Sequence, residues 1–210
     1  MATAELIPIV VEREGRVERS YDIYSRLLKD RIIFIGDEVN SSMCNVVIAQ
    51  LLFLVNEDRK SEIRIYINSP GGSVYAGLGI YDTMQYISCP IATYVVGTAA
   101  SMAAVLFAAG KPGRRFVLPH SRIMIHQPLG GAQGAATDIK IELDEMMRTQ
   151  KQLYGVLSKH TGKSLDQITE DCDRNNWMDA EEAIEYGLAD HVVEAMPAGD
   201  DDGPQPLKTT

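Results

Sequence analysis

Short apolar, β-branched runs alternate with amphipathic runs of helical length from about residue 20 to residue 195, and this alternation restricts the possible folds most. The strand-like runs are residues 31–36, 63–67, 91–96, 115–118, 122–125 and 191–194. Helix-like runs lie at about 41–56, 74–87 and 137–160 and after Ser164 and Asp179, and Ser20 can cap an earlier helix. Strands separated by helices form mostly parallel sheets covered by helices, so the sequence predicts an α/β fold.

The bulk composition narrows the function classes. A chain of 210 residues, 45% of them hydrophobic, can bury one sizeable core, so we expect a single domain over residues 1–196. A net charge of −9 argues against nucleic acid or an anionic membrane as a partner, and the apolar stretches are too short to span a bilayer. Three isolated cysteines without metal-ligand spacing indicate a reducing compartment, so we expect a cytoplasmic protein without a metal or another cofactor.

Two segments depart from the alternating pattern. Residues 137–160 would form a helix about 36 Å long at 1.5 Å per residue, which is long for a domain of this size. We expect this helix to project from the core and to find its burial against another subunit. Residues 197–210 contain three consecutive aspartates and three prolines, and we expect this tail to be disordered.

Ser101 stands in a run of small residues between a predicted strand and a helix-like segment. A serine on a strand-to-helix turn projects its hydroxyl away from the sheet, as hydrolase nucleophiles do. His126 follows the strand-like run 122–125, and the turn at Gly71 and Gly72 can offer bare backbone N–H groups. Together these features supply a nucleophile, a base and oxyanion donors, and they predict a serine hydrolase.

Longer motifs carry a resemblance to a known family. They read YDIYSRLL at 21–28, NSPGG at 68–72, YDTMQ at 81–85, AASM at 99–102 and MIHQPLGG at 124–131. In this order, within about residues 6–193, they resemble the proteolytic subunits of Clp proteases, the ClpP family. The resemblance implies a crotonase-like α/β fold and a serine endopeptidase built as two stacked seven-membered rings. It also implies an AAA+ unfoldase partner, of the ClpX, ClpA or ClpC kind, that feeds in unfolded polypeptide.

The resemblance also assigns roles to single positions. The family nucleophile falls on Ser101, the general base on His126, and the oxyanion N–H groups on Gly72 and Met102. Residues of about 127–160 correspond to the handle that packs ring against ring. Within it, residues 130–136, including Gly130 and Gly131, would form a strand that holds substrate in extended form. Residues 1–19 correspond to the axial segment that lines the pore, and Asp173-Arg174 corresponds to a pair linked to ring–ring contact.

The third triad position departs from the family pattern. Where the family has an aspartate, this chain has Asn175. The amide oxygen of Asn175 can accept a hydrogen bond from His126 Nδ1, but it cannot supply the negative charge that stabilises an imidazolium. We therefore expect a weakened or conditional triad. Asp171 lies one helical turn earlier if the segment is helical, and it is the alternative partner for His126.

A second departure concerns partner docking. The family's apolar pocket for unfoldase loops maps onto Arg64, Tyr66, Tyr86, Tyr94, Val96, Phe116, Leu118 and Val193. The charged Arg64 either lays its stem along this pocket or alters docking. The two departures leave open a weakly active structural or regulatory subunit of a mixed ring, beside a second ClpP type. A crotonase-class CoA-thioester enzyme is a further alternative, although it would need acid–base carboxylates near the glycine turns.

Overall fold

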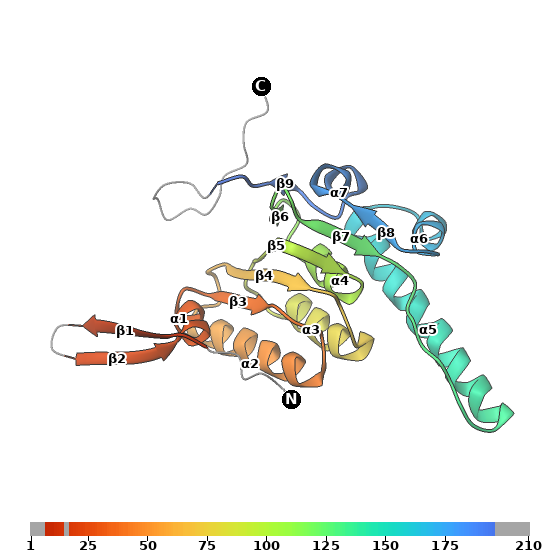
Figure 1. The fold of residues 1–210 in the computed structure, drawn as a ribbon, viewed down its shortest axis with the longest axis horizontal. Helices are drawn as coiled ribbons and strands as arrows, with labels where there is room; N and C mark the ends of the chain where they lie inside the picture. Colours follow the sequence, from red (N-terminus) through yellow and green to blue (C-terminus); the bar gives the residue numbers. More distant parts are fainter. Residues whose placement is uncertain (1–6, 15–16, 196–210) are drawn as a thin grey trace.

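A sheet of seven strands runs through the molecule, and the computed structural model describes residues 7–14 and 17–195 (Figure 1). Within this part of the chain the strands of the sheet are β3 (Ile32–Ile35), β4 (Ile63–Ser69), β5 (Ile91–Ala100), β6 (Arg115–Val117), β7 (Arg122–Ile125), β8 (Asn176–Met178) and β9 (His191–Val192). Neighbours in the order β3-β4-β5-β6-β9 pair in parallel, while β7 pairs in parallel with β5 and antiparallel with β8. This mostly parallel sheet confirms the predicted α/β class.

The helices in the same part of the chain are α1 (Ile23–Lys29), α2 (Ser41–Glu57), α3 (Val74–Tyr86), α4 (Met102–Ala108), α5 (Ala136–Thr161), α6 (Leu165–Asp171) and α7 (Ala180–Tyr186). The predicted starts of α6 and α7 are confirmed, because Ser164 and Asp179 each accept a hydrogen bond from a backbone N–H of the first turn. The predicted cap at Ser20 is wrong. The chain stays extended as far as Asp22, whose carboxylate caps α1 by accepting from the N–H of Ser25 at 2.9 Å.

A hairpin of two strands, β1 (Ile9–Glu14) and β2 (Val17–Asp22), precedes α1 and forms a separate antiparallel sheet. Figure 1 shows it extending away from the main sheet. The sequence did not predict this hairpin, although it lies largely in the expected axial segment of residues 1–19. Residues 1–6 of that segment and the expected disordered tail at 197–210 lie outside the described residues.

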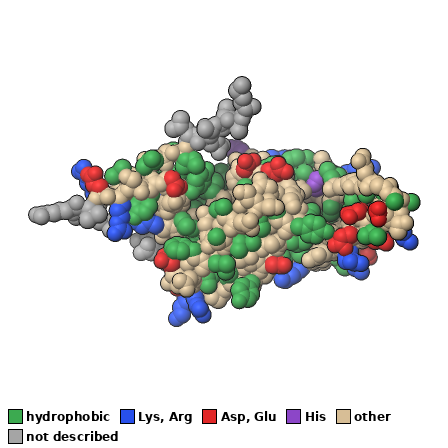
Figure 2. Space-filling model, turned by 90° about the horizontal axis from the view of Figure 1, so that it is seen from below, with side chains coloured by type: hydrophobic (Ala, Val, Ile, Leu, Met, Phe, Trp, Pro, Cys, Tyr) green, Lys and Arg blue, Asp and Glu red, His purple; other side chains and the backbone are tan. Residues whose placement is uncertain are grey.

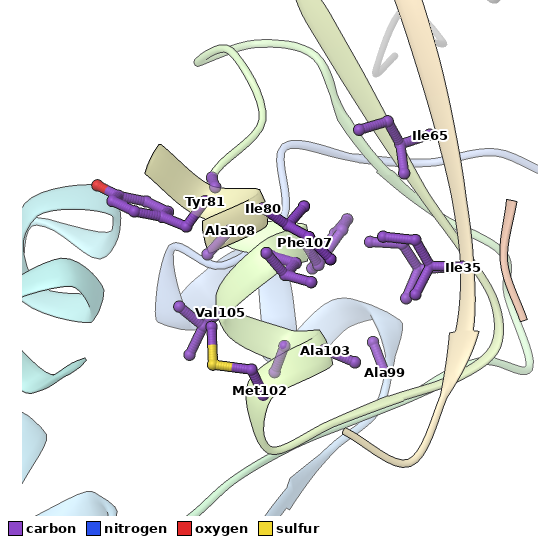
Figure 3. Packing of buried hydrophobic residues seen from close by; sticks show 14 of the residues in the cluster. Ile35, Ile65, Ile80, Tyr81, Ala99, Met102, Ala103, Val105, Phe107 and Ala108 are labelled. Atoms are coloured by element: carbon purple, nitrogen blue, oxygen red, sulfur yellow. The ribbon is translucent and has the colours of Figure 1, made fainter. Parts of the chain in front are cut away.

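The main core lies between the sheet and helices α2, α3 and α4. Alternate residues of β3 and β4 contribute to it and are at most 1% exposed, namely Ile33, Ile35, Ile63, Ile65 and Ile67. Every residue of α4 is buried, and Figure 3 shows Met102, Val105 and Phe107 of this helix surrounded by core side chains. Full burial of an aliphatic or aromatic side chain stabilises a fold by about 1.5–3 kcal/mol. The packing of α4 therefore fixes the turn that precedes it.

Several large hydrophobic side chains remain exposed on the helices α2 and α3. They include Val46, Leu52 and Phe53 on α2 and Tyr75 on α3. Figure 2 views the molecule from below, the side of α2 and α3 in Figure 1, and shows hydrophobic side chains spread over that face. Apolar surface of this kind is typical of contacts between proteins. No helix in residues 7–14 and 17–195 is both long enough and apolar enough to cross a membrane.

The long helix α5 leaves the body of the molecule, as the sequence predicted (Figure 1). Its buried residues are Thr149, Leu153, Tyr154 and Leu157, all in the second half of the helix. In the first half Ile139, Ile141, Leu143 and Met147 are 40–60% exposed. The helix therefore packs on the core with its C-terminal half and presents apolar side chains to the outside with its N-terminal half.

Candidate active site

Ser101 forms the sharp turn between β5 and α4. Its backbone angles, φ 55° and ψ −122°, lie in a region that non-glycine residues rarely adopt. The N–H of Ser101 donates to the Met124 carbonyl at 2.8 Å, and its own carbonyl accepts from the N–H of Ala104 at 3.0 Å. A strained strand-to-helix turn held in this way exposes the hydroxyl at the end of the sheet.

The Gly71-Gly72 turn lies directly against Ser101. A Cβ atom on Gly71 would lie 2.5 Å from the Ala100 carbonyl oxygen and 2.8 Å from Ser101 Cβ, and the residue has φ 91°. At Gly72, with φ 147°, a Cβ atom would lie 2.4 Å from the Val39 carbonyl oxygen. Both positions therefore require glycine, because any side chain would collide with backbone. The absence of side chains brings this backbone turn next to the serine.

The β7–β8 ladder brings His126 opposite Asn175. The ladder pairs Met124 with Trp177 and Ile125 with Asn176, so the next position in register pairs His126 with Asn175. His126 Nδ1 lies 3.1 Å from Asn175 Oδ1, and His126 Nε2 lies 2.8 Å from Ser101 Oγ. An amide oxygen can only accept, which makes Nδ1–H the donor and leaves Nε2 to accept from the serine hydroxyl.

Asp171, the alternative partner, does not contact His126. The Asp171 carboxylate accepts hydrogen bonds from Tyr186 Oη at 2.7 Å and from Gln167 Nε2 at 2.9 Å. These partners lie on α7 and α6, so Asp171 links two helices. In the described part of the chain, therefore, the side chain that faces Nδ1 of His126 is a neutral amide.

The backbone N–H groups of Met102 and Gly72 lie near Ser101 and have no acceptor among the described residues. Met102 is the first residue of α4, where an amide has no intrahelical acceptor. Gly72 comes directly after Gly71, the residue that packs against Ser101. Neither N–H donates to another residue of segments 7–14 and 17–195. Both amides therefore lack an acceptor within the described residues.

A small apolar cavity of about 20 Å³ opens beside Ser101 and His126. Its remaining walls are Val74, Met102, Val105, Ile125, Pro128, Leu153, Tyr154 and Leu157. On the other side of His126 lies a wider hollow of about 410 Å³, lined by Gln127, Leu129, Asp173, Arg174 and Asn175. The walls next to the serine are therefore largely apolar.

The predicted strand over residues 130–136 is not formed. Residues 127–135 have no strand pairing, and α5 begins at Ala136. Gly130 and Gly131 are exposed and lie between the site and α5. A strand is defined by pairing with a second backbone, and beside residues 128–134 the described chain supplies none. Asp173 and Arg174 are also exposed, with side chains 69% and 90% accessible.

The candidate docking residues divide between two faces of the sheet. A row of stacked rings crosses the face opposite α2–α4, formed by Phe34, Tyr66, Tyr94, Phe116 and His191 with neighbouring centroids 4.6–5.6 Å apart. The apolar cluster on this face also includes Val193, and Val96 and Leu118 follow Tyr94 and Phe116 at alternate positions of the chain. Tyr86 ends α3 on the other side and is 84% exposed. Within one chain, Tyr86 is therefore separate from the others.

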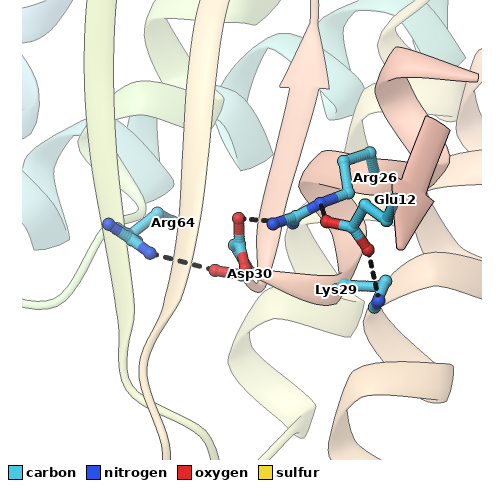
Figure 4. Close-up of polar contacts among 5 residues, drawn as sticks. All are labelled: Glu12, Arg26, Lys29, Asp30 and Arg64. Carbon is cyan, nitrogen blue, oxygen red and sulfur yellow. Dashed lines mark hydrogen bonds and ion pairs between the residues drawn. The ribbon is translucent and has the colours of Figure 1, made fainter. Parts of the chain in front are cut away.

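Arg64 lies at the edge of this aromatic row and takes part in a polar network (Figure 4). Its guanidinium donates to the Asp30 carbonyl at 3.0 Å. The Asp30 carboxylate pairs with Arg26, and Arg26 and Lys29 both bind Glu12 of β1. The hydrogen bonds from Lys29 and Arg26 hold the pKa of Glu12 below its usual value. Arg64 therefore contributes to the support of α1, which holds the hairpin.

A serine hydroxyl, an imidazole and two free amides at the carboxyl end of a parallel sheet define the class of serine hydrolases. The Clp protease family matches residues 15–196 of the chain. A curated relative, ATP-dependent Clp protease proteolytic subunit 1 of Salinibacter ruber (strain DSM 13855 / M31), is 57% identical over 188 residues, which cover 90% of this chain and 81% of the relative. The chain belongs to the Clp protease family and is a serine endopeptidase. Membership implies assembly into rings and association with Clp ATPases.

Proposed function

We propose that Ser101, His126 and Asn175 form the catalytic triad of a peptidase with reduced activity. The continuous chain of hydrogen bonds from Ser101 Oγ through His126 to Asn175 Oδ1, at 2.8 Å and 3.1 Å, carries this proposal. Ser101 is the nucleophile, His126 is the general base, and Asn175 orients the imidazole in place of aspartate. The N–H groups of Gly72 and Met102 form the oxyanion hole.

The reaction proceeds through an acyl-enzyme. Ser101 Oγ attacks the peptide carbonyl carbon while His126 Nε2 takes the hydroxyl proton, and the amides of Gly72 and Met102 stabilise the resulting oxyanion. The C–N bond then breaks, and His126 returns the proton to the leaving amine. In the second half, His126 deprotonates a water molecule, which hydrolyses the ester on Ser101.

Asn175 lowers the rate through the charge that it lacks. His126 becomes an imidazolium in both transition states, and an amide stabilises this cation less than a carboxylate does. In a serine protease of another fold, the same replacement lowers turnover roughly 10⁴-fold. We use this value as an upper bound, because Asn175 Oδ1 is placed to keep His126 in the required tautomer.

In the assembled protein, the exposed half of α5 packs ring against ring, and the rings are two stacked heptamers. The aromatic row and Tyr86 from an adjacent chain receive loops of an AAA+ unfoldase. Unfolded polypeptide then pairs in extended form with the backbone around Gly130 and Gly131. The backbone of residues 128–134, which makes no hydrogen bond to another described backbone group, and the exposed apolar side chains of α5 support these proposals. Three buried free thiols favour the reducing cytoplasm as the location.

A second candidate function is a weakly active subunit of a mixed ring. The specific observation that favours it is the neutral side chain opposite His126. In such a ring, a second ClpP type with a complete triad would perform most of the hydrolysis.

A serine-directed fluorophosphonate tests the assignment of the site. We expect the purified protein to become labelled at Ser101 and to hydrolyse a short fluorogenic peptide slowly, whereas Ser101→Ala does neither. Ser121 serves as the control serine for labelling. Its buried hydroxyl donates to the Val95 carbonyl, so we expect no label at this residue. Labelling of correctly assembled Ser101→Ala at the same rate would contradict the assignment.

A further inference from the structure

Gln127, the residue after His126, makes two hydrogen bonds to the turn that carries Asn175. Its backbone N–H donates to the Cys172 carbonyl at 2.6 Å. Its side-chain Nε2 donates to the Asp173 carbonyl at 2.7 Å. The general base and the turn of its partner are therefore connected by a single residue, independently of the bond between His126 and Asn175.

These contacts begin where the β-ladder ends. Ile125 and Asn176 are the last paired positions of β7 and β8, and His126 and Asn175 are the next pair in register. Beyond that pair the chain returns toward α6, and Gln127 replaces the ladder by reaching the carbonyls of the turn. The pair of His126 and Asn175 is thus held on both sides, by the ladder and by Gln127.

The far side of the turn is already anchored. Cys172 is fully buried and caps α6, and its neighbour Asp171 accepts from Tyr186 of α7. Asp173, Arg174 and Asn175 are exposed, so little packing restrains them. The position of Asn175 Oδ1 relative to His126 therefore depends on how the backbone carbonyls of the turn are held.

We propose that Gln127 is a positioning residue that keeps Asn175 opposite His126, and this proposal rests on the proposed role of Asn175. A carboxylate is drawn toward the imidazolium by its charge and presents two equivalent oxygens. An amide has a weaker attraction, and rotation exchanges its acceptor for a donor. With asparagine at position 175, alignment relies on the backbone that Gln127 holds.

The test compares Gln127→Met in two backgrounds, the native chain and Asn175→Asp, with hydrolysis of a short fluorogenic peptide by the assembled protein. Methionine keeps the length of the side chain but cannot donate. In the native background we expect kcat to fall about tenfold with KM within about twofold, since a small misplacement of catalytic groups mainly affects the chemical step. In the Asn175→Asp background we expect a fall of no more than about threefold, because the charge restores the alignment.

Gln85→Met is the matched control. Gln85 Nε2 also donates to a backbone carbonyl, that of Ala109, at 3.2 Å, but far from the site on α3. We expect kcat of this variant to stay within about twofold of the native value. Ring assembly and melting temperature are recorded for every variant. If Gln127→Met does not assemble, Gln127→Leu replaces it, because leucine also lacks the donor and adds no charge.

Equal losses of kcat in the two backgrounds would overturn the positioning role, since a purely structural effect does not depend on the charge at residue 175. A loss of less than about twofold in the native background would overturn it as well. Both outcomes leave the proposed triad intact. By contrast, failure of Asn175→Asp alone to raise kcat would overturn the role of Asn175, and the inference with it.

Discussion

The two ends of the parallel strands carry polar clusters of opposite character. At the amino ends, the guanidinium of Arg115 lies 2.6 Å from the Asp190 carboxylate, and their side chains are only 8% and 16% exposed. Arg115 also donates to the carbonyls of His160 and Gly187. At the carboxyl ends, His126 faces the neutral Asn175.

The charged pair at the amino ends bears on the stability of the fold, whereas the neutral partner of His126 at the carboxyl ends bears on activity. Burial raises the pKa of Asp190, but hydrogen bonds from Arg115 and its positive charge outweigh burial, so this carboxyl stays ionised to unusually low pH. The fold thus places a carboxylate beside a cation where four segments of the chain meet. At the site it places a neutral amide beside the histidine, and under the proposed mechanism the missing charge lowers transition-state stabilisation.

The largest expected effect is at the site. We expect His126→Ala to lower peptide turnover about 10³-fold or more, because Ser101 loses its base. The free energy of unfolding should change by less than about 1 kcal/mol, since His126 is only half-buried. Steady-state kinetics and chemical unfolding on the same preparation measure both quantities. Retention of a tenth of the native turnover would contradict the account.

The next largest effect is expected at the amino ends of the strands, at the pair of Arg115 and Asp190. We expect Asp190→Asn to lower the free energy of unfolding by about 3–5 kcal/mol, because Arg115 keeps a buried charge without its partner. Turnover per folded molecule should remain unchanged. The double variant Arg115→Met/Asp190→Asn is the control and should recover part of the stability. A loss below about 1 kcal/mol at fixed protein concentration would show that the cluster is not a stabilising centre.

The stability of the cluster at the amino ends should also depend on pH, through His160. Burial, followed by the charges of Lys159 and Arg115, lowers the pKa of His160 to about 4. Between pH 6.5 and 4 the unfolded chain therefore binds more protons, so stability falls as the pH is lowered through this range. From pH 7 to 5 we expect a loss of about 1 kcal/mol after allowance for solvent screening.

Chemical unfolding at both pH values measures this slope. His160→Gln should remove it, whereas the control His120→Gln, at an exposed position, should retain it. A slope that is unchanged in His160→Gln would assign the pH dependence to other groups.

The smallest effect concerns Asp171, the carboxylate near the site that the structure assigns to the scaffold. We expect Tyr186→Phe to cost about 1 kcal/mol of stability through the lost hydrogen bond. Peptide turnover should change less than about threefold, because Asp171 does not face His126. A tenfold loss of turnover with unchanged stability would instead place Asp171 in the catalytic machinery.

The sequence predicted those parts of the site that follow from local chemistry. Ser101 becomes a candidate because small residues lie between a strand and a helix, whereas Asn175 becomes a candidate only through the resemblance to the Clp proteases. The bonds of Gln127 could not be found, since their acceptors are backbone carbonyls about 45 residues away in the chain. Such contacts depend on how β7, α6 and β8 meet in space.

Further features of the fold do not follow from the local sequence, for similar reasons. The β1–β2 hairpin pairs mainly with itself, and Ile9 and Val11 are 71% and 55% exposed, so a buried face gave no guide to it. The strand expected at residues 130–136 requires a second backbone that the described chain does not provide. Tyr86 is assigned to the docking residues by the family resemblance alone; within one chain it lies at the end of α3, apart from the aromatic row, and its part in docking stays a prediction.

We propose above that the neutral side chain of Asn175 limits an otherwise complete peptidase. The most direct test is the turnover of a short fluorogenic peptide by Asn175→Asp compared with the native protein, with Ser101→Ala/Asn175→Asp as the control. We expect a rise in kcat of about 100-fold or more, within the roughly 10⁴-fold bound, and no activity in the control. A change of less than about threefold in correctly assembled protein would contradict the claim, because the missing charge would then not limit the reaction.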